Sequence, residues 1–179
     1  MPIAKQKNWV RNTLICSSLF FCLGLLYGFF SVQLNLNIND LTPESSSSSM
    51  AAIAQNNLIF GASLLVLGIV SFCVIPMILL FLNGSLTGAV VFAVFSGGHH
   101  ETLVTGLLPH ILFEVYGFFL ITSSSIIPIE LALLSVSHKY LSKDYIKTSS
   151  LYFMRLILSG IFFIIVGVFI EGNFSYVKF

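Results

Sequence analysis

The sequence predicts an all-α polytopic membrane protein with about five transmembrane helices, one of them short, broken or re-entrant. Three observations lead to this fold class. Only 8% of the 179 residues are charged, whereas an average soluble domain has roughly 25%. Hydrophobic residues make up 56% of the chain, and its mean hydropathy is +0.97. Because such a chain lacks the polar surface that a water-soluble fold needs, we expect a single transmembrane domain over residues 1–179, with the lipid bilayer as its surroundings.

The first predicted helix spans residues 9–32. Lys5, Lys7 and Arg11 precede its apolar run, as they would in a signal peptide. The run of about 20 residues is longer than the roughly 7–15 of a signal peptide, and no small-x-small cleavage pattern follows it. We therefore interpret it as an uncleaved anchor. The next segment, residues 33–55, is polar and rich in serine, which is typical of a flexible loop.

An uncharged stretch of about 40 residues follows, long enough for two passes. Its breaks are Pro76 and the Asn83-Gly84 pair, and Asn-Gly is a strong turn signal. We therefore predict a second helix over residues 58–82 and a short third helix over residues 84–96. The alternative is a break inside the bilayer at Pro76 or Asn83-Gly84, where protein or water must satisfy the freed backbone groups.

The last two predicted helices span residues 109–136 and 151–170. Pro109 suits the first turn of the fourth helix, and the segment before it, residues 103–108, is expected to be interfacial or partly re-entrant. The linker between the two helices, residues 137–149, contains three lysines.

The charge distribution predicts the orientation in a cell membrane. Lys5, Lys7 and Arg11 favour a cytoplasmic N-terminus, because positive charge is enriched in cytoplasmic segments. Five passes then make residues 33–55, which contain no Lys or Arg, an extracytoplasmic loop. They make residues 137–149 a cytoplasmic basic linker. The C-terminus is then expected outside.

Charge and motifs argue against several other function classes. The net charge is +1, and no basic block is long enough to follow a nucleic-acid backbone. Cys16, Cys22 and Cys73 all lie in apolar runs, which disfavours a disulfide framework and a structural zinc site with its usual four ligands. The sequence has no P-loop and no serine-nucleophile elbow. We therefore expect no cofactor and no bound metal.

Glycine spacing predicts close contacts between helices. Two pairs have the small-xxx-small spacing that lets helix backbones approach, and a third pair is seven residues apart on one helix face. Two interpretations are open: packing within the chain, or docking of a partner subunit, which includes a second copy of this chain. The glycines concerned are Gly24 and Gly28, Gly84 and Gly88, and Gly61 and Gly68.

The main candidate site is the pair His110 and Glu114, which share one helix face because they are four residues apart. Ionisable groups within a bilayer are costly and mark functional sites. The pair could hydrogen-bond to each other and to neighbouring helices, with Glu114 protonated. It could bind a metal, although a third and a fourth ligand are lacking. It could also be an acid–base pair for transport or hydrolysis. Asn83 is either a turn residue or a third member of this polar node.

A second polar pair lies near the inner ends of the fourth and fifth predicted helices. Glu130 follows Pro128 in the fourth helix, and Arg155 lies early in the fifth. Because the linker between these helices is short, we expect the two side chains to form a structural ion pair.

Three motifs together resemble the stage II sporulation protein M family. They are Asn56-Asn57 at the start of a glycine-bearing helix, Asn83-Gly84 with Gly88, and Pro109-His110 with Glu114. The resemblance covers about residues 56–125, and Ile111 stands where the family pattern has glycine. It implies a bacterial or archaeal membrane protein that works in a complex with other membrane subunits. The implied settings are sporulation-type engulfment with cell-wall hydrolases, and export, maturation or self-protection for a peptide bacteriocin alongside an ABC-type ATPase.

The leading hypothesis for function is a non-enzymatic membrane subunit of a multiprotein complex. One alternative is an intramembrane hydrolase or peptide-processing enzyme that uses His110 and Glu114. Another is a small proton-coupled carrier that uses Glu114 as its proton site.

Overall fold

The computed structural model describes residues 3–35, 50–98, 103–137 and 141–174, and this part of the chain is helical without any strand. Its elements are α1 (Ile3–Asn35), α2 (Met50–Val70), α3 (Val74–Ser96), η2 (Leu103–Leu107), α5 (Leu108–Ser124), α6 (Ile126–Val136) and α7 (Lys143–Phe174). Five helical spans are long and apolar enough to cross a membrane, with α5 and α6 together forming the fourth. This confirms the predicted all-α polytopic class.

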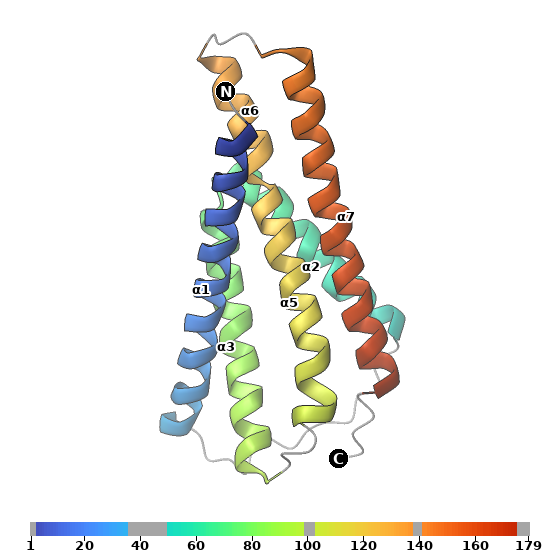
Figure 1. The fold of residues 1–179 in the computed structure, drawn as a ribbon. Helices are drawn as coiled ribbons and strands as arrows, with labels where there is room; N and C mark the ends of the chain where they lie inside the picture. The colour runs from blue at the N-terminus through green and yellow to red at the C-terminus, as the bar shows by residue number, and fades with distance from the viewer. Residues whose placement is uncertain (1–2, 36–49, 99–102, 138–140, 175–179) are drawn as a thin grey trace.

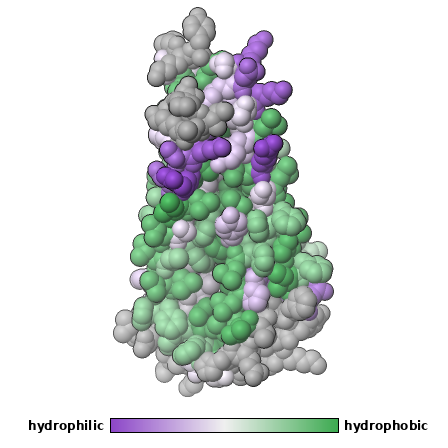
Figure 2. All heavy atoms as spheres, viewed as in Figure 1, coloured by the Kyte–Doolittle hydropathy of each residue, from purple (hydrophilic) through white to green (hydrophobic). Residues whose placement is uncertain are grey.

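The helices form one elongated bundle, in which α2 leans across the others (Figure 1). The most extensive helix contacts join α1 to α3 and α5 to α7. The α2 helix packs on α5, α7 and α3 and links the two pairs. The start of α1 and the end of α7 lie at opposite ends of the bundle. Apolar side chains cover most of the visible face, and hydrophilic ones gather toward the end where α1 starts (Figure 2).

The turn between the second and third spans lies at Ser71–Cys73 and not at Asn83-Gly84, so the predicted helix boundaries were wrong there. Phe72 and Cys73 adopt positive φ angles of 52° and 67°, and the Ser71 hydroxyl accepts a hydrogen bond from the Ile75 amide at 3.0 Å. Asn83-Gly84 lies inside α3, which is a full-length helix of 23 residues.

The predicted break at Pro76 or Asn83-Gly84 was wrong, because both lie within the continuous helix α3. The interruption is in the fourth span, where α5 ends at Ser124 and α6 begins at Ile126. Pro128 has no amide hydrogen to donate to the carbonyl of Ser124, four residues earlier, so regular helical bonding cannot continue there. Beside this interruption, the hydroxyls of Ser124 and Ser125 donate to the carbonyls of Ile121 and Thr122 at 2.7 Å each. The segment before α5, expected to be interfacial or partly re-entrant, contains the five-residue π-helix η2.

Glycines allow the backbones of α1 and α3 to touch. A Cβ atom on Gly24 would overlap the Phe81 carbonyl, and one on Gly28 would overlap the Ser85 carbonyl. Likewise, a Cβ on either of two α3 glycines would overlap an α1 carbonyl; these glycines are Gly84, against Phe21, and Gly88, against Leu25. Both predicted small-xxx-small pairs therefore pack against each other within the chain.

The third glycine pair, Gly61 and Gly68, lets α2 pack closely against neighbouring side chains. A Cβ on Gly61 would meet the side-chain ends of Ile121 and Ile164, and a Cβ on Gly68 would overlap the Ser125 side chain. These contacts also lie within the chain. They border the central apolar cluster of Leu64, Leu80, Phe118, Ile121, Ile164 and Val168.

Parts of the two predicted loops lie outside the described residues. In the polar segment 33–55, residues 36–49 are not described, while residues 33–35 belong to α1 and residues 50–55 to α2. In the basic linker 137–149, residues 138–140 are not described, and α7 already begins at Lys143.

We predict that Gly28→Ala destabilises the fold by about 1–3 kcal/mol, because the added methyl group overpacks a backbone-to-backbone contact. Gly61→Ala is the matched control, since the nearest obstacle there is the end of a flexible side chain, the Ile121 Cδ1 atom, at 3.1 Å. Unfolding in detergent should show a clearly larger loss for Gly28→Ala. Equal losses would contradict the close α1–α3 contact.

Candidate functional site: a polar pocket between α2, α5 and α7

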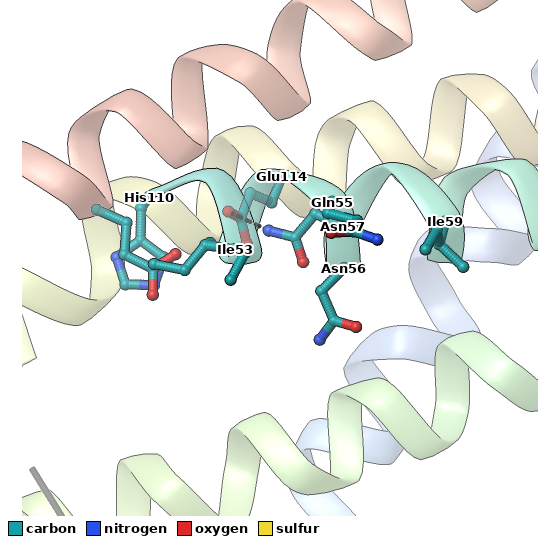
Figure 3. A pocket seen from close by; sticks show the side chains of 9 residues that line it. Ile53, Gln55, Asn56, Asn57, Ile59, His110 and Glu114 are labelled. Carbon is teal, nitrogen blue, oxygen red and sulfur yellow. Dashed lines mark hydrogen bonds between the residues drawn. The ribbon is translucent and has the colours of Figure 1, made fainter. Parts of the chain in front are cut away.

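The candidate site lies where three helices bring polar side chains together in an otherwise apolar bundle (Figure 3). The first turns of α5 supply His110 and, one turn later on the same face, Glu114. Early α2 supplies a run of amide side chains that includes Asn57, and late α7 supplies Glu171.

Glu114 is held between two other helices. It is buried, with 9% of its surface exposed, and its Oε1 atom accepts a hydrogen bond from Nδ2 of Asn57 at 2.6 Å. On the α7 side, a Cβ added to Gly167 would overlap the Glu114 side chain and would lie 3.0 Å from the His110 carbonyl oxygen. The absence of a side chain at Gly167 thus lets α7 close over Glu114, while Asn57 ties α2 to it.

The space beside Glu114 is a pocket of about 520 Å³. Its wall consists of Ala52, Ile53, Gln55, Asn56, Asn57, Ile59, His110, Glu114 and Glu171. The carboxylate of Glu171 is close enough to interact electrostatically with that of Glu114. His110 is buried, Asn57 and Glu171 are half-buried, and Gln55 and Asn56 are exposed. The pocket therefore has a buried floor on α5 and an open rim on α2.

The structure brings together two of the three predicted members of the polar node. His110 and Glu114 both line the pocket, whereas Asn83 does not. Asn83 lies in α3, half-buried, and its carbonyl oxygen accepts a hydrogen bond from the Thr87 hydroxyl at 3.0 Å. The amide that bonds to Glu114 belongs to Asn57 instead.

Sequence reasoning did not assign Asn57 or Glu171 to the site. The Asn56-Asn57 pair was a usable signal, because it stands directly before the predicted second helix, where polar side chains entering an apolar span need partners. Glu171 gave no such signal, since it lies close to the predicted end of the fifth helix, where a carboxylate can reach water.

The metal interpretation gains no support from the geometry. Among the residues described, no group of three or more His, Cys, Asp or Glu side chains is arranged to hold a metal ion.

The predicted ion pair between Glu130 and Arg155 is not brought together. Glu130 is buried in α6, and within the described part of the chain neither of its carboxylate oxygens has a hydrogen-bond partner. Arg155 is exposed on α7. On α7, Tyr145 interacts electrostatically with Glu130. Close to Tyr145 in sequence, Ser149 accepts a buried hydrogen bond from Gln6 of α1 at 3.1 Å.

Five apolar spans with a polar pocket between them define a multi-pass helical membrane protein. The family model described as "Stage II sporulation protein M" matches residues 17–176, nearly the whole chain, and the protein belongs to this family. Comparisons with curated proteins and with solved structures each found no match.

We predict that Asn57→Ala lowers the free energy of unfolding by about 1–3 kcal/mol, because it leaves the buried Glu114 carboxyl without its hydrogen-bond donor. Asn56→Ala is the matched control at the preceding residue, whose side chain is exposed. Unfolding of both variants in detergent tests this, and a loss of the same size in the control would argue against the Asn57–Glu114 bond.

A separate prediction concerns the other end of the fourth span. Arg155→Gln should change the free energy of unfolding by no more than about 0.5 kcal/mol, as is usual for surface substitutions away from specific contacts. Glu130→Leu should maintain or raise stability, because a buried carboxyl without a hydrogen-bond partner is replaced by an apolar group. Substantial destabilisation by both variants in detergent unfolding would contradict this and would support the predicted ion pair between Glu130 and Arg155.

Proposed function

We propose that this protein is a non-enzymatic membrane subunit of a multiprotein complex, and that the pocket around Glu114 is the polar node on which its assembly depends. The observation that carries the proposal is the 2.6 Å hydrogen bond from Asn57 to Glu114. It joins α2 to α5 at the point where Gly167 lets α7 close over the same carboxyl group. One buried side chain thus sets the relative positions of three helices.

The share of the chain that lies in membrane spans supports a role as a subunit. The described residues are almost entirely apolar spans, and the sequence has no nucleotide-binding P-loop. A protein of this kind can position and gate other membrane components, but energy for moving a substrate has to come from a partner. An ABC-type ATPase is the partner we propose for export, maturation or self-protection of a peptide such as a bacteriocin.

Membership of the stage II sporulation protein M family supports a second setting. In it, this subunit acts in a sporulation-type engulfment complex that includes cell-wall hydrolases. In both settings the subunit contributes helix packing and a polar site, while the chemistry belongs to its partners. Co-purification with an ATPase or with a hydrolase distinguishes the two settings.

We further propose that α1 starts on the cytoplasmic side of the cell membrane and that α7 ends outside. Lys7 and Arg11 are exposed near the start of α1, and positive charge favours the cytoplasmic side. The pocket is built from early α2, early α5 and late α7, which lie toward the other end of the bundle (Figure 1). In this orientation the pocket faces the outer side.

We predict that Glu114→Ala reduces assembly of the complex about tenfold. Loss of the hydrogen bond from Asn57 costs enough free energy to lower the fraction of molecules with correctly packed helices about tenfold. Glu114→Gln should retain assembly, since its amide oxygen still accepts that hydrogen bond. Asp144→Ala, at an exposed carboxylate of α7, is the control. The measurement is recovery of partners with the tagged protein from membranes, and normal recovery with Glu114→Ala would refute the proposal.

A further inference from the structure

The pocket around Glu114 is mainly acidic. Glu114 and Glu171 supply two carboxyl groups, and His110 is the one basic side chain among the nine lining residues. Two carboxyl groups close together in a low-dielectric wall repel each other when both are ionised, and a cation bound beside them relieves that repulsion. The pocket is therefore complementary to positive charge.

The size of the pocket points to an organic group and not to a bare ion. Its volume of about 520 Å³ is within the range of roughly 300–1,000 Å³ that is typical of sites for small organic ligands. An inorganic cation would need several close ligands, and the described residues hold no cluster of three or more metal-binding side chains. A long, flexible cationic side chain can fill such a space while its charged end reaches the floor.

The rim offers hydrogen-bonding groups that suit a polypeptide. Gln55 and Asn56 carry amides that can donate to a backbone carbonyl and accept from a backbone N–H. Figure 3 shows Asn57 and Glu114 pointing toward one another, while Asn56 extends away from that pair. The amides of Gln55 and Asn56, both exposed, are thus available at the rim for an entering chain.

We infer that this pocket binds a cationic group of a polypeptide, an ammonium or a guanidinium, with Glu114 and Glu171 as its counter-ions. The amides of Gln55 and Asn56 bond to the adjoining peptide backbone. Ile53 and Ile59, which also line the pocket, pack against the methylene groups of a lysine or arginine side chain. This inference rests on the proposed function, because a complex that handles peptides supplies such a ligand.

Binding of short peptides to the full chain in lipid nanodiscs tests the inference. The probes are a blocked peptide with lysine at its centre flanked by glycines, its arginine and norleucine analogues, and an all-glycine peptide with a free amino terminus. The lysine and arginine peptides should bind at least about tenfold more tightly than the norleucine peptide, since a charge-assisted hydrogen bond contributes that much. The all-glycine peptide separates a terminal ammonium from a side-chain cation as the preferred ligand.

The variants separate this inference from the proposed function. The double variant Glu114→Gln, Glu171→Gln retains the bond from Asn57 but removes both ionisable carboxyl groups, so it should lose the preference for cationic peptides while remaining assembled. Glu130→Gln, at a buried carboxyl outside the pocket, should retain that preference. Equal binding of the norleucine peptide, or an unchanged preference in the double variant, would overturn cation recognition. Failure of the Glu114→Ala assembly test alone would overturn only the proposed role in the complex.

Discussion

The junction of α2, α5 and α7 is organised around one carboxyl group, that of Glu114. A buried carboxyl without partners is destabilising, and at this position groups from two neighbouring helices stabilise it. Glu114 accepts a hydrogen bond from Asn57 on α2 and lies beneath Gly167 on α7. These contacts lie where α2 and α7 both pack against α5. The pocket forms beside them, because early α2 places a run of amides next to the same carboxyl group.

Glycine contacts supply the framework that holds this arrangement. Between helices in lipid the driving force comes from close packing, and small residues allow the necessary approach. The α1–α3 pair achieves it with glycines on both helices, and the α5–α7 pair achieves it where Gly117 and Gly160 face each other. The two tightly packed pairs are joined by α2 and by direct contacts between α1 and α5. The polar site is built at the junction of α2 with α5 and α7, where the positions of three helices have to agree.

The sequence predicted the class of fold because hydropathy and helix length alone determine it. It did not predict where α2 ends, because the turn uses positive φ angles at Phe72 and Cys73, which carry no Gly or Pro signal. Asn83-Gly84 is a turn motif in most settings, but here Gly84 is needed inside a helix for contact with α1. His110 and Glu114 were predictable as neighbours because helix periodicity places them on one face. Their partners depend on helix crossing and rotation, which no local pattern specifies.

The central claim is that Asn57 and Glu114 are energetically coupled across the α2–α5 contact. A double-mutant cycle with Asn57→Ala, Glu114→Ala and the double variant, followed by unfolding in detergent, measures this coupling directly. We predict a coupling free energy of about 1 kcal/mol, within the range found for hydrogen bonds between membrane helices. Additive effects of the two substitutions, within about 0.3 kcal/mol, would contradict it.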